Sequence, residues 1–259
     1  MFKKQALIPI FILLFVLSGR IASHTLWLNL SDYSPERRRS IVYFGWGHRY
    51  PVDDFLDQEK FLKRFFLIKP SGKVENLTPN PGGFLATQVK FLENGTYIVS
   101  AELKPGFYTM YMEKGKIHHK LGPKTGVKGV ILSQYYEQYA KAIVNVGEGS
   151  SLKPIGQKLE IVPLENPGKL KCGDFLRVQV LFENKPVKYC PVFATYNGFS
   201  TGEDFAYATS TDNEGIARIR LLHWGPWLIK VNYKIPPTEE FKDKCDQLSY
   251  TATLTFEVQ

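Results

Sequence analysis

The histidines are the residues of this chain with the clearest capacity for chemistry. The 259 residues contain only five of them. His24 directly follows a segment typical of a secretory signal, in which Lys3 and Lys4 precede the apolar run Ala6–Leu17 and a short polar stretch. Cleavage after Ser23 would make His24 the first residue. Its α-amine and imidazole Nδ1 would then close a six-membered chelate ring on one metal ion. The alternative is that a histidine stands at this boundary by accident.

A second histidine, His48, lies in a segment that predicts a rigid loop. Two glycines flank Trp46, and a proline soon after His48 restricts the turn. The carboxylates of Asp53 and Asp54 can ligate a metal or orient the His48 ring by a hydrogen bond. If the first predicted strand pairs with the strand that ends at Trp46, His24 and His48 lie near one edge of a sheet. The alternative is an exposed histidine in an ordinary turn.

The other three histidines have weaker claims to a metal site. His223 precedes a Gly-Pro turn between two tryptophans, so it is either a further ligand or part of a packing corner. His118 and His119 are adjacent and point to opposite faces in a strand, so that at most one joins a site. They lie within 114–128, which contains five lysines and no acid. This segment predicts a solvated loop or the tip of a long hairpin.

Several function classes lack their characteristic residues. The sequence has no Gly-x-Ser-x-Gly motif and no cysteine with a histidine partner, so we predict no enzyme activity. Loss of residues 1–23 removes three basic residues and no acidic one, which lowers the net charge from +8 to +5. No nucleic-acid-binding motif accompanies this charge. Cys172 and Cys190 are expected at opposite ends of a hairpin, whereas Cys245 can pair with either.

The elements that must position these residues are predicted to be strands. Apolar residues make up 44% and charged residues 22%, an ordinary globular balance, and the 14% of aromatic residues favours β structure. Short alternating runs such as Thr25–Leu30 and Phe175–Phe182 are separated by turn signals. Ser133–Ala142 has helical spacing and predicts the one helix. We therefore predict an all-β fold of two tandem β-sandwich domains: residues 1–23 as signal peptide, 24–125 as the N-terminal sandwich, 126–150 as a connecting segment with a short helix, and 151–259 as the C-terminal sandwich.

Motifs in order along the chain resemble those of the NikM-like family of exported domains. The resemblance covers nearly all of residues 24–259. It rests on the start His24-Thr25-Leu26-Trp27, the segment Tyr136–Ala142, the pattern from Gly156 to Pro167, Gly173-Asp174, Lys185-Pro186-Val187, Thr211-Asp212-x-x-Gly215 and Gly225-Pro226-Trp227.

The resemblance implies an N-terminal β-sandwich followed by a transthyretin-like or carboxypeptidase-regulatory-like β-sandwich. It also implies the handling of nickel or cobalt, with His24 as a ligand. We therefore predict a periplasmic or secreted protein that captures Ni(II) or Co(II), with Cu(II) as a competing ion. The predicted ligands are His24, His48, His223 and Asp53. The predicted partners are components of a membrane metal transporter, contacted peripherally through protein rather than lipid.

Two other functions are compatible with the same residues. Two histidines around an N-terminal amine resemble the histidine brace of copper polysaccharide monooxygenases, which would make the protein an enzyme. Alternatively, the β-sandwiches form a binding module for a glycan or a protein, and His24 has no role. Loss of metal binding on extension of the N-terminus separates the metal hypotheses from the binding module.

Overall fold

The computed structural model describes residues 24–149 and 152–259, which form an all-β protein. The all-β prediction is therefore confirmed. The predicted signal peptide, residues 1–23, lies outside the described residues. Within them, no helix is long and apolar enough to span a membrane. The helical turns are short: α1 (Gln58–Phe61), η1 (Pro167–Lys169) and η2 (Glu239–Phe241).

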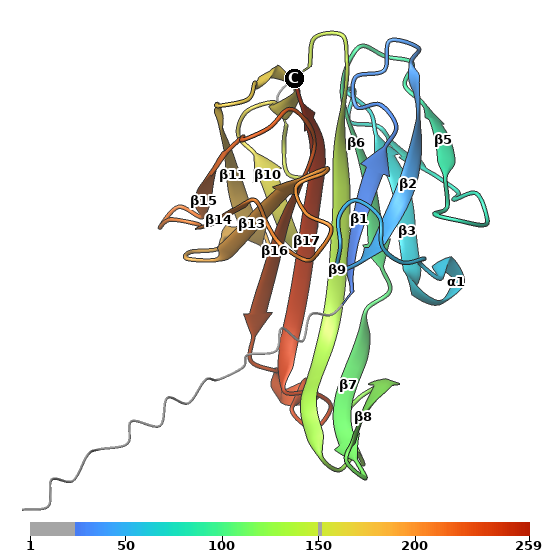
Figure 1. Cartoon of the computed structure of the whole chain (residues 1–259), viewed down its shortest axis with the longest axis vertical. Coiled ribbons are helices and arrows are strands. Elements are labelled where there is room, and N and C mark those ends of the chain that lie inside the picture. The colour runs from blue at the N-terminus through green and yellow to red at the C-terminus, as the bar shows by residue number, and fades with distance from the viewer. Residues whose placement is uncertain (1–23, 150–151) are drawn as a thin grey trace, which may run out of the picture.

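One sheet of ten strands runs through the whole protein (Figure 1). At its centre, β9 (Val130–Val146) pairs with β17 (Gln247–Val258) in parallel and with β6 (Gly95–Leu103) antiparallel. The main path of the sheet runs β14 (Tyr207–Ser210), β13 (Pro191–Tyr196), β16 (Gly225–Ile235), β17, β9, β6, β3 (Leu62–Ile68) and β4 (Val74–Asn76).

Two smaller sheets cover this large sheet. The first consists of β1 (Thr25–Leu30), β2 (Arg39–Gly47) and β5 (Thr87–Lys90). The second consists of β10 (Leu159–Pro163), β11 (Phe175–Phe182), β12 (Lys185–Pro186) and β15 (Ile216–Arg220).

The two smaller sheets pack on opposite faces of the large one. From β9, Ala140 and Val144 belong to the core under β1 and β2, whereas Tyr139 and Ile143 belong to the core under β10 and β11. Neighbouring residues of a strand point to opposite faces, so the two cores lie on opposite sides of β9. The two sandwiches therefore share one sheet. The predicted connecting segment 126–150 coincides largely with β9, a strand of that sheet.

The helix predicted over Ser133–Ala142 is wrong, because this segment is part of the 17-residue strand β9. Its tyrosines and alanines recur at a spacing that fits one face of a helix. A strand buried on both faces also lacks the alternation of polar and apolar residues by which strands are recognised. Pairing with β6 and β17 determines the outcome, since it satisfies the backbone groups of β9 on both edges.

A three-stranded extension of the large sheet is here called the arm. It consists of β7 (Gly106–Glu113), β8 (Lys116–Leu121) and the part of β9 that pairs with β7, Val130–Tyr136. Figure 1 shows it extending beyond both sandwiches. Lys114 and Gly115 turn the hairpin with φ angles of 50° and 75°. Segment 114–128 therefore contains the hairpin turn and β8, and its remainder after Leu121 is a loop that leads to β9.

The strand β1 is attached to the large sheet through side chains. The Gln138 side chain accepts a hydrogen bond from the Leu26 N–H at 2.9 Å and donates one to the His24 carbonyl oxygen at 2.7 Å. Thr253 and Thr255 of β17 donate to the carbonyl oxygens of Leu26 and Leu28 at 2.8 and 2.6 Å, respectively. These four bonds fix where the chain enters β1, and therefore where His24 lies.

A buried ion pair connects the two halves. Lys141 of β9 and Glu160 of β10 are 2% and 1% exposed, and Nζ lies 2.5 Å from Oε1. Glu160 also accepts the N–H groups of Ile155 and Gly156. Burial lowers the pKa of Lys141, and the nearby Glu160 carboxylate opposes this shift. Every oxygen of Glu160 is thus engaged, as the burial of a carboxylate requires. The three cysteines are free; Cys190 and Cys245 are buried and Cys172 is exposed.

We expect Lys141→Met to reduce the free energy of unfolding by about 3–5 kcal/mol, because it leaves the Glu160 carboxylate buried without its cation. The double variant Lys141→Met/Glu160→Leu should recover much of this loss, since it leaves no buried charge. Urea denaturation measures both variants, with Lys185→Met on exposed β12 as the control. A Lys141→Met variant as stable as the control would contradict the role assigned to this pair.

Candidate functional site

The pairing of β1 with β2 brings His24 and His48 together. Thr25 pairs with Gly47 across the two strands, so the residues just outside this pair are neighbours. The ring centroids of His24 and His48 are 4.6 Å apart, with an angle of 54° between the ring planes. The expectation that these two histidines lie near one sheet edge is met by the structure.

The loop after β2 is held in shape by Asp53. Its carboxylate accepts the backbone N–H of His48 at 2.7 Å and that of Arg49 at 3.3 Å, and it pairs with the Arg49 guanidinium. Burial raises the pKa of Asp53, but these hydrogen bonds outweigh it, so the pKa is lowered overall. Gly47 has a φ of 135°, and a Cβ there would lie 2.4 Å from Asp53 Oδ2. Asp53 therefore orders the backbone at His48, and both of its carboxylate oxygens bind groups of His48 and Arg49 in this loop.

His48 has the properties of a neutral imidazole available to a ligand. Burial lowers its pKa, and the neighbouring His24 lowers it further. Its Nδ1 is buried and has no hydrogen-bond partner. A buried polar atom without a partner is unusual in a folded protein, and metal coordination is one way to satisfy it. Neutral imidazole is also the form that binds metals.

The ring of His24 is held on two sides. Its Nε2 lies 3.6 Å from Asp54 Oδ2, and Trp46 stacks on the ring with centroids 5.4 Å apart. Asp54 therefore lies at ion-pair distance from the Nε2 side of the ring. Nδ1 is the nitrogen nearer the main chain.

The spacing of the two rings suits a shared ion. Imidazole nitrogens bind metals at about 2.0 Å. Two imidazoles whose nitrogens bind one ion with an N–metal–N angle of about 90° therefore have ring centroids about 4.5 Å apart. The observed 4.6 Å between His24 and His48 agrees with this geometry. Among residues 24–149 and 152–259, no three side chains of the His, Cys, Asp or Glu type are arranged to hold a metal ion. His24 and His48 are thus two neighbouring imidazoles without a third side chain of these types placed to share one ion with them among the described residues.

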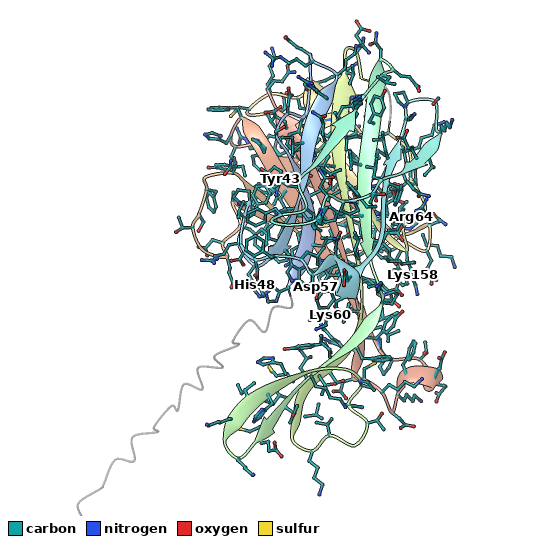
Figure 2. All side chains as sticks on the ribbon, turned by 90° about the vertical axis from the view of Figure 1, so that its right-hand side faces the viewer. Tyr43, His48, Asp57, Lys60, Arg64 and Lys158 are labelled. Carbon is teal, nitrogen blue, oxygen red and sulfur yellow. The ribbon has the colours of Figure 1, made fainter. Side chains whose placement is uncertain are left out.

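A groove of about 560 Å³, here called the histidine groove, separates this pair from the arm. His119 of β8 lines it on the arm side, and its Nδ1 lies 2.5 Å from the Tyr108 hydroxyl. Figure 2 shows His48 and Asp57 at the end of the sandwich next to the arm. His118 stacks on Tyr111 and does not line the groove. The strand alternation predicted that at most one of the two adjacent histidines would join a site, and His119 is the one that lines this groove.

His223 does not line the histidine groove. It lies between β15 and β16, where its ring stacks on Tyr196 at 4.7 Å and its Nδ1 contacts the Trp224 carbonyl oxygen at 2.5 Å. The Trp227 indole N–H donates to the His223 carbonyl oxygen. These contacts agree with the packing-corner interpretation of this turn.

Comparison with known proteins places the chain in a family. The profile of a domain of unknown function, DUF4198, matches residues 21–235. The chain belongs to the DUF4198 family. The description of this family assigns no function, and the resemblance to NikM-like domains stays a prediction. No curated protein matches the chain.

Solved structures show only low similarity to this DUF4198 protein. A tetra-tandem repeat from the extending region of a large adhesion protein is 8% identical, covers 92% of this chain and 74% of that one, and has a TM-score of 0.24. The D0–D1 domain of intimin is 13% identical over 89% and 96%, with a TM-score of 0.21. Alpha-2-macroglobulin of Escherichia coli is 10% identical over 92% and 20%, with a TM-score of 0.23. At these scores the likenesses support no inference about the site.

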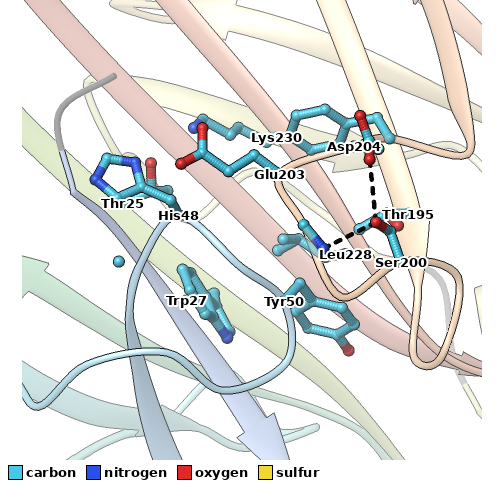
Figure 3. Close-up of a pocket in the computed structure, with 13 residues that line it drawn as sticks. Thr25, Trp27, His48, Tyr50, Thr195, Ser200, Glu203, Asp204, Leu228 and Lys230 are labelled. Atoms are coloured by element: carbon cyan, nitrogen blue, oxygen red, sulfur yellow. Dashed lines mark hydrogen bonds between the residues drawn. The ribbon is translucent and has the colours of Figure 1, made fainter. Parts of the chain in front are cut away.

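Two charged residues of this DUF4198 protein lie near His48 without having been predicted from the sequence. Lys230 of β16 and Glu203, from the segment between β13 and β14, line a small pocket together with His48. Figure 3 shows the three side chains at the same end of this pocket. Burial lowers the pKa of Lys230 to about 8, and Glu203 opposes the shift. A lysine within an otherwise apolar β-strand pattern was the available signal.

The pKa of Lys230 makes a signed prediction about stability. In the folded protein Lys230 loses its proton near pH 8, because burial disfavours the charged amine. In the unfolded chain it keeps the proton up to the ordinary pKa of 10.5. The free energy of unfolding should therefore rise between these two pH values, by up to about 3 kcal/mol. Lys230→Met should abolish the rise. Urea denaturation at both ends of this range measures it, with Lys185→Met as control. The same pH dependence in all three proteins would contradict the prediction.

Proposed function

We propose that this protein is an exported metal-binding protein that captures Ni(II) or Co(II) through His24 and His48 and delivers the ion to a membrane uptake transporter. The observation that carries the proposal is the 4.6 Å separation of the two rings. It is supported by the buried, unpartnered Nδ1 of His48. The family resemblance is consistent with it but does not establish it.

The proposed ligand set depends on processing after Ser23. Cleavage there gives His24 an α-amine, whose pKa near 8 allows a metal to displace its proton at neutral pH. The amine and Nδ1 of His24 then supply two nitrogens on one residue. His48 supplies the third nitrogen, and the Asp54 carboxylate lies 3.6 Å from His24 Nε2, where its charge favours binding of a cation. Three nitrogens leave coordination positions for water, or for His119 from the arm.

The choice of ion follows from the donor atoms. Nitrogen donors without thiolate favour the later first-row metals, in the order Co(II), Ni(II), Cu(II). Cu(II) would outcompete Ni(II) in affinity, so supply decides which ion the protein carries. Delivery needs exchange, and the histidine groove leaves one side of the pair open. A transporter component can approach the ion from that side.

Isothermal titration with Ni(II) tests the ligand set directly. Protein that begins at His24 should bind one ion, and the same protein with one extra N-terminal glycine should bind it at least about 100-fold more weakly, because the chelate ring is lost. His48→Phe should also weaken binding, and His223→Phe should not. Equal Ni(II) affinity of the first two proteins would exclude the α-amine of His24 as a ligand. No binding by any form would remove the proposed function.

Asp54→Asn tests the carboxylate that contacts His24. We expect it to weaken Ni(II) binding by about 10–100-fold, because the neutral amide removes the negative charge beside the His24 ring and no longer raises its basicity. The stability of the metal-free protein should change little, since the Asp54 side chain is 60% exposed. Titration of Asp57→Asn, which also lies on the groove, is the matched control. An affinity equal to that of the control would assign Asp54 no part in the site.

A further inference from the structure

A second groove, here called the polar groove, lies on the large sheet beside His48. It has a volume of about 410 Å³, within the usual range for small-molecule sites. Its floor is one face of β9, β16 and β17, and Glu203 and Phe205 line its rim. The floor residues follow from the strand registers: Gln134, Tyr136 and Gln138 on β9, Ser249 and Thr251 on β17, and Lys230, Asn232 and Lys234 on β16.

Lys230 is the main charge of this groove. It pairs across the strands with Phe193 on one side and Thr253 on the other, so its stem lies between two neighbours on the sheet. No salt bridge of the described residues includes Lys230. Glu203 is the acid with an electrostatic effect on it. A largely buried ammonium group without a direct counterion favours an anion from outside the chain.

Hydroxyl groups provide further donors. The Asn232 side-chain N–H group donates to Ser249 Oγ at 3.0 Å and to Thr251 Oγ1 at 2.9 Å. Each hydroxyl therefore accepts one bond and keeps its own O–H to donate. Both residues line the polar groove, as does Lys234. The groove thus combines ammonium and hydroxyl donors with the aromatic rings of Phe193 and Phe205, which contact each other at 5.2 Å.

We propose that the polar groove binds a small hydroxylated carboxylate, such as a sugar acid or a hydroxy acid, with its carboxylate at Lys230. The hydroxyl and amide groups of the floor suit the hydroxyls of such a ligand, and the aromatic rings suit its carbon skeleton. A singly charged anion fits better than a phosphate. Glu203 at the rim repels a dianion, and the lining includes neither an arginine nor a helix N-terminus.

This site is separate from the proposed metal function. The two grooves share His48, Tyr136 and Gln138, so they are adjacent. The residues assigned to the carboxylate, however, are Lys230, Ser249 and Thr251, and none of these lines the histidine groove. Binding of the carboxylate therefore needs no metal, and it can be measured in metal-free protein.

Calorimetric titration of the metal-free protein with D-glucuronate, D-gluconate and L-lactate tests the proposal, with D-glucose and inorganic phosphate as comparison ligands. At least one carboxylate should bind, and glucose and phosphate should bind at least about tenfold more weakly. Lys230→Met should weaken carboxylate binding about tenfold or more, since a hydrogen bond to a charged group is lost. Lys185→Met changes an exposed lysine of β12 that does not line the polar groove, so this variant should bind as the unchanged protein does.

Carbon-13 NMR of the lysine Cε atoms gives a second measurement that does not depend on the folding of a variant. Saturating glucuronate, or whichever carboxylate binds, should move the Lys230 signal and raise its titration midpoint. The other titratable groups of the adjoining pockets enter the same titration; they are Lys234, His48, Glu203, Asp204, Tyr50 and Tyr136. The proposal is overturned if no carboxylate binds, if Lys230→Met binds equally well, if phosphate binds more tightly, or if the Lys230 signal does not move.

Discussion

The parallel pairing of β9 with β17 is the constraint on which the rest of this structure depends. It joins two β-sandwiches edge to edge in one sheet, so that β9 is buried on both faces. The two smaller sheets cover opposite faces of the large sheet. Within each sandwich, one face of the large sheet is therefore covered by a smaller sheet and the other face is not. The polar groove lies on such an uncovered stretch of β9, β16 and β17, next to the end of β1. Both candidate sites thus arise where one sandwich ends and the other begins.

The attachment of β1 explains why His24, which directly precedes this strand, has a defined place. Its backbone bonds to side chains of Gln138, Thr253 and Thr255, which belong to strands far along the chain. These bonds cross from one sheet to the other, in addition to the pairing with β2. A segment near a terminus is seldom held this firmly unless it is tied into a sheet. Here these hydrogen bonds hold the His24 imidazole against that of His48.

The sequence predicted the strands well where apolar residues alternate along the chain and poorly where this alternation is missing. Thr25–Leu30 and Phe175–Phe182 match β1 and β11 residue for residue. Ser133–Ala142 is a strand whose tyrosines and alanines recur at helical spacing, so it lacks the alternation on which strand prediction relies. The proximity of His24 and His48 followed from one assumed strand pairing. The distance of His223 from the other two histidines and the position of Lys230 beside His48 depend on the order of strands in the sheet. Local sequence patterns do not encode this order.

The shared sheet also affects how the chain can be divided. A cut between β9 and β10 would separate two hydrophobic cores, but it would also strip β17 from one edge of β9. That edge would then present unpaired N–H and C=O groups, with buried residues on both faces of the same strand. Such an edge is a template for association with other strands. Each half would therefore tend to aggregate when made alone, and a fragment series aimed at isolating one sandwich should retain β9 and β17 together.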